Sequence, residues 1–340
     1  MSFQNAKIGT AGTNPRDYHG QVIRHRGDKD YWASPSMLRE FDTCASRWRA
    51  GYSGPDSDAK DYGNVLDCMV TTPGAFDKFY AVQPETYAAP ATHAKVKKGE
   101  INFGDPLPWN ANASVCQEWE ELQGGREIIS NKIHSAAVTA LTVLNCDDFI
   151  SNLLIISAFQ VQVNAEWVDK ATGLSIPVRC LIDMVPDVGS VRFGNCLADL
   201  KSARSAHPAA WPKHCFELGY HVQAAMNLDM YSAATGEDRN TFLHVVSENY
   251  PPFQPARSMM SAELVELGRA KYRRCLAKYA QCLATDQWPG YEAGQQVIDG
   301  FTLCEPPRWA ALQEAASNGN SLDNLPPFVP SEQFLSETPT

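Results

Sequence analysis

Apolar positions in the first part of the chain recur at helical spacing. After Ser34-Pro35, a typical helix N-cap and first helical position, they stand three or four residues apart, at Leu38, Phe41, Ala45 and Trp48. This spacing predicts a helix that begins at Ser34. A second predicted helix ends before Pro73, and its apolar face consists of Tyr62, Val65, Leu66, Met69 and Val70. A third helix is predicted over residues 129–144.

The middle of the chain changes to a two-residue period. Apolar residues at 159, 161, 163, 165 and 167 alternate with polar ones, which predicts a half-buried strand. A turn over 169–173 and a strand over 176–183 complete a hairpin, and a third strand is predicted over 191–201. A helix over 214–231, a strand over 241–247 and a helix over 262–284 follow. This order predicts an α/β protein whose mixed central sheet, an antiparallel meander plus one crossover strand, is flanked by helices.

The two ends of the chain differ from this core in composition. Residues 1–30 are polar, and residues 301–340 are rich in proline, serine and asparagine, a mixture that folds poorly. We therefore expect an N-terminal extension over 1–30, one domain over 31–300 and a proline-rich tail over 301–340. Residues 84–108 are rich in Pro, Ala, Thr, Lys and Gly and predict a long loop.

Composition narrows the class of protein. Of the 340 residues, 44% are hydrophobic and 20% are charged, values typical of a soluble globular chain with a sizeable core. No apolar run approaches the roughly 18 residues of a membrane helix, and the polar N-terminus has no apolar signal segment. We therefore expect a cytoplasmic protein. The ten cysteines include no Cys-x-x-Cys pair and mostly lie in apolar stretches, which favours reduced core thiols.

The net charge of −10 argues against general electrostatic adhesion to nucleic acid. It leaves room for a local basic groove, because residues 201–216 contain no acid and residues 257–278 carry six basic residues against two acids. The alternative is that both segments are ordinary solvated helix faces.

Three charged residues on neighbouring predicted strands carry the candidate chemistry. Asp183 ends the second strand, and Asp199 and Lys201 stand two apart on the third, so the latter two point to the same side of the sheet. A turn centred near 189–191 would bring Asp183 close to Asp199. Two neighbouring carboxylates repel unless a cation lies between them, and Mg²⁺ prefers oxygen ligands, to which the carbonyl of Leu200 could add. Such a metal activates water that a lysine can orient or deprotonate. The alternative is a surface ion pair.

These three residues belong to a longer succession of short motifs along the sequence. In chain order, the motifs are residues 34–38 with Cys44, 62–63 with Val70, 73–76, 173–183, 198–203, 219–225 and 288–291. The succession resembles the PD-(D/E)XK nuclease superfamily, and within it the exodeoxyribonuclease VIII (RecE-type) enzymes of phages and prophages. The resemblance spans roughly residues 34–291. Its most specific part runs from Asp183 through Asp199-x-Lys201 to Tyr220-x-x-Gln223.

The resemblance implies a restriction-endonuclease-like core and a Mg²⁺- or Mn²⁺-dependent deoxyribonuclease. The enzyme would digest linear double-stranded DNA from its ends, in the 5′-to-3′ direction. By motif, Asp183 and Asp199 would be metal ligands, Lys201 would be the catalytic lysine, and Gln223 would contact the nucleophile region or the DNA backbone. Asp67 and the Leu200 carbonyl complete the expected metal ligands.

The resemblance also implies partners. The protein would act in phage-type recombination inside a bacterial host cell, form a homo-oligomer and feed single strands to an annealing recombinase. Arginine suits phosphate, so basic residues of the first predicted helix are candidate DNA contacts, although exposed helix arginines are the alternative. The candidate DNA-binding residues are Arg39, Arg47, Arg49, Arg204 and Tyr220.

The sequence departs from the family pattern at three places. Asp67 stands where the family usually has a histidine ligand, and Gln162 stands at the place of a strand glutamate, with Glu166 as the nearest acid on that face. Asn227 stands four residues after Gln223, where a tyrosine is expected. These departures favour an alternative, a DNA-binding relative with weakened catalysis. A second alternative is a RecB-like nuclease with an iron–sulfur cluster, for which the candidate ligands are Cys44, Cys275, Cys282 and Cys304.

Overall fold

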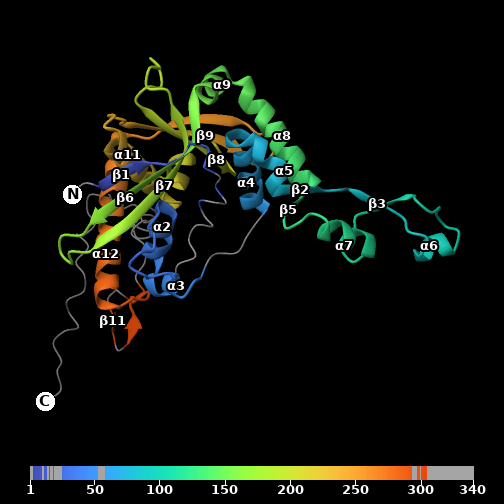
Figure 1. Ribbon diagram of the computed structural model, residues 1–340, viewed down its shortest axis with the longest axis horizontal. Coiled ribbons are helices and arrows are strands. Elements are labelled where there is room, and N and C mark those ends of the chain that lie inside the picture. Colours follow the sequence, from blue (N-terminus) through green and yellow to red (C-terminus); the bar gives the residue numbers. More distant parts are fainter. Residues whose placement is uncertain are drawn as a thin grey trace, which may run out of the picture. The chain divides into compact units, whose positions relative to one another are not determined.

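A six-stranded sheet forms the centre of the fold in the computed structural model (Figure 1). Its strand order is β1-β6-β7-β8-β9-β10. The strands β8 and β9 are parallel and every other neighbouring pair is antiparallel, which confirms the predicted mixed sheet. The bounds are β1 (Gln4–Ile8), β6 (Ser157–Val168), β7 (Ser175–Pro186), β8 (Cys196–Ala203), β9 (Thr241–Glu248) and β10 (Pro255–Met259).

The structure describes residues 3–9, 11–13, 15, 18, 25–52, 58–292, 297–298 and 300–304. The chain divides into two units, Met1–Trp288 and Pro289–Thr340. The sheet and all elements of the candidate site belong to the first unit. In the second unit, β11 (Val297–Ile298) pairs with β12 (Phe301–Thr302). Most of the expected proline-rich tail lies outside the described residues.

The strands extend the predicted ones in some places and shorten them in others. The hairpin of β6 and β7 closes through the predicted turn, where Gly173 N donates to Asp169 O over 2.9 Å. The third predicted strand begins at Cys196 rather than at residue 191, because turns such as Gly194 N to Ser190 O (2.8 Å) occupy the residues before it. The expected N-terminal extension contributes the edge strand β1, which pairs with β6.

One face of the sheet is covered by α2 (Pro35–Thr43), α11 (Tyr220–Thr235) and α12 (Ala262–Thr285). Ser34 caps α2 as predicted, because its Oγ accepts from Met37 N over 3.2 Å. The first predicted helix is nevertheless two helices. Cys44 adopts an extended backbone, so α2 ends there and α3 (Ala45–Arg49) begins.

The other face is covered by α4 (Asp58–Thr71), α8 (Asn131–Cys146) and α9 (Asp148–Ile155). Gly63 allows α4 to approach β8 closely, since a Cβ at this position would lie 2.8 Å from Ser202 Oγ. The third predicted helix begins two residues late, at Asn131, because residues 127–130 form β5 (Glu127–Ser130) beside β2 (Tyr80–Gln83).

The remaining elements connect these layers. They are the 3-10 turn Pro73–Ala75, α5 (Phe76–Phe79), β3 (Thr86–Ala88), α6 (Ala94–Lys97), β4 (Pro106–Pro108), α7 (Ser114–Glu121) and α10 (Trp211–Glu217). The region expected as a loop over 84–108 therefore contains the hairpin of β3 and β4, which encloses α6. Within the described residues, no single helix has the length and apolarity to cross a membrane, and only α8 and α9 together, across a 97° bend, meet that test.

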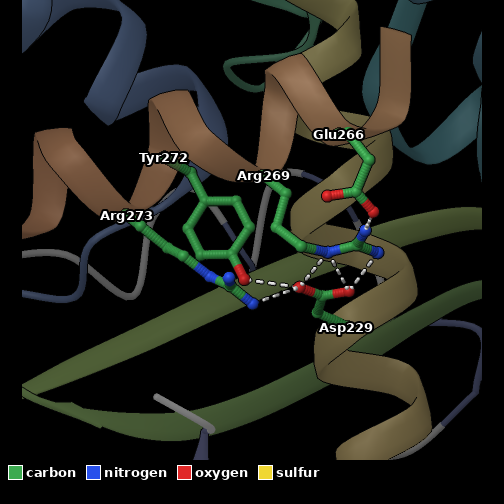
Figure 2. Close-up of polar contacts among 5 residues, drawn as sticks. All are labelled: Asp229, Glu266, Arg269, Tyr272 and Arg273. Carbon is green, nitrogen blue, oxygen red and sulfur yellow. Dashed lines mark hydrogen bonds and ion pairs between the residues drawn. The ribbon is translucent and has the colours of Figure 1, made fainter. Parts of the chain in front are cut away.

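A charged network ties α11 to α12 (Figure 2). Asp229 of α11 accepts hydrogen bonds from Arg269 Nε (2.9 Å) and from Tyr272 Oη (2.5 Å), and Arg273 Nη2 lies 3.6 Å away. Glu266 contacts the outer side of Arg269. One carboxylate thus organises three side chains of α12, which fixes the register between the two helices.

Candidate active site

A cleft of about 550 Å³ opens where α4 and α11 meet the strands β6, β7 and β8. Five of the predicted catalytic and metal-binding residues line it: Asp67, Asp183, Leu200, Lys201 and Gln223. Asp199 is fully buried beside them. Residues from four elements, far apart in the sequence, therefore converge on one place in the fold.

The pairing of β7 with β8 brings the two strand carboxyls together. Met184 pairs with Ala198, and one regular antiparallel step from this pair would set Asp183 opposite Asp199, where a hydrogen bond joins the two carboxyls. Asp183 Oδ2 accepts a hydrogen bond from Leu200 N over 3.1 Å. The side chain of Asp183 thereby takes a backbone donor of β8 and is held at the edge of the cleft.

Lys201 and Gln223 both contact the carboxylate of Asp199. The Lys201 ammonium forms an ion pair with Asp199 Oδ2, and Gln223 Nε2 donates to Asp199 Oδ1 over 3.2 Å. Gln223 reaches this position because the predicted helix 214–231 is broken into α10 and α11. Gly219 between them has φ +71°, a conformation that suits glycine, and α11 begins directly after it. The Tyr220 ring centroid then lies 4.8 Å from Lys201 Nζ.

Asp67 reaches the cleft from α4. Its Oδ2 accepts a hydrogen bond from Gln160 Nε2 over 3.3 Å, and the same amide donates to Thr71 Oγ1 over 3.0 Å. Gln160 is buried and also lines the cleft, and the other atom of its amide, Oε1, has no hydrogen-bond partner among the described residues. Asp67 of α4 therefore lies at the same cleft as the acids of strands β7 and β8.

Gln160 is a site residue that the sequence pattern missed. The resemblance placed Gln162 at the position of a strand glutamate, but Gln162 Nε2 donates to Asn164 Oδ1 over 2.9 Å and does not line the cleft. Gln160 has φ +50°, and the ladder of β6 with β7 omits the pair formed by Gln160 and Asp183. This irregular backbone directs the Gln160 side chain into the cleft. Glu166 also lies elsewhere, where its Oε2 accepts from Ser175 Oγ over 3.0 Å.

Burial and neighbouring negative charges raise the pKa of two carboxyls. Burial, followed by the charge of Asp199, raises the pKa of Asp67 to about 7. The same two causes raise the pKa of Asp183 well above its ordinary value. Burial alone would also raise the pKa of Asp199, but the Lys201 ammonium and a hydrogen bond from Asp183 hold it below its ordinary value. Asp199 is therefore the ionised member of the group at neutral pH.

The same charges keep Lys201 protonated. Burial would lower the pKa of Lys201, but the adjacent Asp199 and Asp183 charges raise it above its ordinary value. Lys201 is therefore a cation at neutral pH, not a free base. The buried His244, beside Asp199 on β9, stays neutral, because burial lowers its pKa to about 4.

The donor set suits a hard divalent cation. Three carboxyls and the backbone carbonyl of Leu200 offer only oxygen, the ligand that Mg²⁺ prefers. The high pKa of Asp67 and Asp183 is the response expected when carboxyls converge without enough positive charge between them. Within the described residues, no group of three or more His, Cys, Asp or Glu side chains is already arranged around a coordination position. In this structure the Lys201 ammonium takes the place of a counter-cation on Asp199.

Asn227 lies one helical turn beyond Gln223 and faces the same cleft. Its side chain is fully buried, and neither Oδ1 nor Nδ2 has a partner among the described residues. Unpaired buried amides are costly, so this residue and Gln160 leave polar atoms available to a ligand or to water. The sequence singled out Asn227 only as a departure from the family pattern.

The predicted DNA-binding residues divide into two groups. Arg39 and Tyr220 line the cleft, and Arg39 Nη1 donates to Leu218 O over 3.2 Å. Arg204 lines a neighbouring groove. Arg47 and Arg49 line neither, and their guanidinium groups lie 3.6 and 5.4 Å from the ring centroids of Tyr52 and Trp288. The structure thus places two of the five in the cleft and one in a separate groove.

Cys44, Cys275 and Cys282, three candidates for an iron–sulfur cluster that belong to the first unit, do not form a metal-holding group. Cys44 Sγ lies 3.4 Å from Ser46 Oγ on the N-terminal side of α3, and Cys275 and Cys282 are buried in α12. The described part of the chain contains no metal-holding group of three or more cysteines, histidines or acids. Cys304 belongs to the second unit of the chain.

Comparisons with known proteins agree with this architecture. Residues 170–298 match the family model described as "PDDEXK-like domain of unknown function (DUF3799)". A crystal structure of a "putative exonuclease" from Eubacterium rectale has a TM-score of 0.52 at 14% identity, over 89% of this chain and 98% of that one. A second structure, named SSO0001, has a TM-score of 0.25 at 14% identity and covers 46% of this chain and 67% of that one. No curated protein matches the sequence.

The matched region begins just before β7 and extends past α12, so it contains Asp183, Asp199, Lys201 and Gln223. The mixed sheet with helices on both faces agrees with the structural neighbour. Residues 170–298 therefore match a PDDEXK-like domain, and this match confirms the predicted PD-(D/E)XK superfamily, while the structural neighbour supports the predicted fold. The narrower resemblance to exodeoxyribonuclease VIII stays a prediction.

Proposed function

We propose that the protein is a divalent-metal-dependent deoxyribonuclease that degrades linear double-stranded DNA from its ends, in the 5′-to-3′ direction. The observation that carries this proposal is the convergence of Asp67, Asp183, Asp199 and Lys201 on one cleft within a PD-(D/E)XK fold. The preference for ends and the direction rest on the sequence resemblance. So do the homo-oligomer, the annealing recombinase and the role in phage-type recombination.

The residues of the cleft would have different roles in hydrolysis. Asp67, Asp183, Asp199 and the Leu200 carbonyl would hold Mg²⁺ or Mn²⁺. When bound, such an ion polarises the phosphodiester and lowers the pKa of a coordinated water. Gln223 fixes the orientation of Asp199 through its 3.2 Å hydrogen bond. Lys201, which carries a proton at neutral pH, would offset the negative charge that develops on the phosphoryl oxygens.

The bonds that change are those at one phosphorus. The oxygen of water bonds to phosphorus, and the bond from phosphorus to the 3′ oxygen of the neighbouring nucleotide breaks. One water is consumed, and the products are a 5′-phosphate and a 3′-hydroxyl. The protonated Lys201, held beside Asp199 at the cleft, would donate a hydrogen bond to the leaving 3′ oxygen, which takes up one proton, while the attacking water gives up one proton to solvent.

End-labelled plasmid DNA tests the proposal. Linear duplex should be degraded in Mg²⁺ or Mn²⁺ but not in EDTA, covalently closed circles should survive, and a 5′ label should be released before a 3′ label. Cleavage of closed circles would replace the exonuclease with an endonuclease, and early release of the 3′ label would reverse the direction.

A second candidate is a DNA-binding relative with weakened catalysis. It is favoured by the absence of a preformed three-ligand group within the described residues and by the amide of Gln160 on Asp67. This candidate predicts metal-independent DNA binding with no degradation in Mg²⁺, Mn²⁺ or Co²⁺. Degradation of linear DNA by the wild type in any of these ions would exclude it.

A further inference from the structure

A second groove lies beside the cleft, at the end of β8. Its lining includes Arg204, Ser205, Lys213, His214, Glu217 and Tyr250, and it is called the Arg204 groove below. Arg204 directly follows Ala203, the last residue of β8, and stands three residues after Lys201. At about 3.3 Å per strand residue, this step spans about 10 Å.

The groove presents positive charge that the protein itself does not neutralise. Arg204 is exposed and makes no hydrogen bond or ion pair with any residue that the structure describes. The Lys213 side chain is 77% exposed, and its ion pair with Glu217 is 3.8 Å long between two exposed groups. Such pairs contribute little, so Lys213 can exchange Glu217 for a better anion at small cost. The guanidinium fork of Arg204 matches the geometry of a phosphate.

Aromatic rings connect the groove to the cleft. The Tyr220 ring lies 4.8 Å from Lys201 Nζ on one side and 6.3 Å from the His214 ring on the other. Trp211 supports both, with ring centroids 5.6 Å from His214 and 5.8 Å from Tyr220. Packed rings therefore link Lys201 in the cleft to His214 in the groove.

Tyr250 gives the groove a second kind of contact. It is 46% exposed, in the turn between β9 and β10. An exposed ring beside unneutralised cations is the combination that binds single-stranded nucleic acid, because the ring stacks on an unpaired base while the cations hold phosphates. A paired base inside a duplex does not offer its face to such a ring.

We propose that the Arg204 groove binds a separated DNA strand, with a phosphate near the scissile bond on Arg204 and Lys213 and a base on Tyr250. This inference rests on the proposed function, because it takes the scissile phosphate to lie at Lys201. The groove would be an additional site that binds the strand after it has left the duplex. Its ligand would be a sugar–phosphate backbone with at least one unpaired base.

Fluorescence anisotropy with a labelled single strand, in EDTA to prevent cleavage, tests the groove. The Arg204→Ala/Lys213→Ala variant should bind about 10-fold more weakly than wild type at moderate salt, and the salt slope of its affinity should fall by about 0.7 for each phosphate that the protein no longer neutralises. Tyr250→Ala should weaken binding to a single strand but not to a blunt duplex. Lys170→Ala, which removes an exposed charge from the turn between β6 and β7, is the matched control and should bind as wild type.

The outcomes separate this inference from the proposed function. If wild type degrades DNA but the double variant keeps the wild-type affinity and salt slope, the groove assignment is wrong and the nuclease stands. If wild type neither degrades nor binds DNA, the proposed function itself fails. All three groove side chains are substantially exposed, so the variants should fold, and an unchanged melting temperature verifies this.

A modified strand locates the bound phosphate. A neutral methylphosphonate, placed in turn at the linkages near the scissile bond, should weaken wild-type binding at one of them and leave the double variant unaffected there, because the variant has no cations at that position. Equal weakening of both proteins at these linkages would overturn the proposed position.

Discussion

Gln160 Nε2 donates to Asp67 Oδ2 over 3.3 Å and thereby joins strand β6 to helix α4 inside the cleft. The contact depends on an unfavourable backbone, since Gln160 is not glycine and yet has φ +50°. Such conformations cost on the order of 1–3 kcal/mol and persist where the surrounding structure enforces them, often at functional sites. The fold thus maintains strain at the residue that holds one of the three carboxyls.

Replacing Gln160 separates this backbone strain from the side chain's contact. Gln160→Gly should unfold at a temperature at or above that of Gln160→Ala, because glycine adopts positive φ without cost. Both variants should bind Mn²⁺ about 10–100-fold more weakly than wild type, since both lack the group that orients Asp67. Calorimetric titration with Mn²⁺ and thermal unfolding give the two quantities.

Gln162→Ala is the control for these variants. It removes the same amide two residues further along β6, where the side chain contacts Asn164 and lies outside the cleft. Its Mn²⁺ affinity should equal that of wild type. If Gln162→Ala and Gln160→Ala weaken Mn²⁺ binding equally, Gln160 has no special role at Asp67.

The raised pKa of Asp67 predicts how the metal-free protein responds to pH. The pKa is about 7 in the fold and about 4 in the unfolded chain, so the folded state binds more protons between these values. Stability from this group is therefore lost as pH rises from about 4 to about 7, and the loss is complete above pH 7. In EDTA, Asp67→Asn should melt close to wild type at pH 4.5 and a few degrees above it at pH 8.

Divalent metal should reverse this order at pH 8. Mn²⁺ stabilises whichever protein binds it more tightly, and wild type has the additional carboxylate. The difference in melting temperature between the two proteins reports on Asp67 alone, because both proteins contain the other titratable groups of the site: Asp183, Asp199, Lys201 and His244. A melting difference that stays constant from pH 4.5 to 8 in EDTA would mean that Asp67 keeps an ordinary pKa.

The network in Figure 2 predicts a loss of stability that is independent of metal. Asp229→Ala leaves Arg269, Tyr272 and Arg273 without their shared acceptor. We expect a loss of about 2–4 kcal/mol in the free energy of unfolding, because a partly buried charge group loses its partner. Glu266→Ala, which removes a 67% exposed partner of Arg269, should change it by less than about 0.5 kcal/mol. Urea unfolding measures both, and equal losses would contradict the central role of Asp229.

Much of the sheet and of the site was predictable from local pattern. The two-residue period and the turn before Gly173 define the hairpin of β6 and β7, and the length of the next turn places Asp183 beside Asp199. Side-chain direction in a strand then sets Asp199 and Lys201 on one side. These inferences hold because they need only regular strand geometry.

The errors arose where the backbone is irregular or the signal is non-local. The family pattern pointed to Gln162, but the backbone of Gln160 has a positive φ, and Gln160 lines the cleft instead. Gly219 breaks a helix that apolar spacing alone would continue. The strand β1 is short and mostly exposed, so its pairing with β6 depends on tertiary contact that no local pattern of five residues records.

Degradation of end-labelled linear duplex in Mg²⁺ by wild type, Asp199→Asn and Lys201→Met tests the central claim most directly. Both substitutions are close in size to the native side chains and alter the charge of one cleft group. We predict that wild type releases nucleotides and that each variant is slower by at least about 10²-fold, while both still bind DNA in EDTA. Degradation by either variant at the wild-type rate would show that the cleft of Asp183, Asp199 and Lys201 does not carry out the hydrolysis.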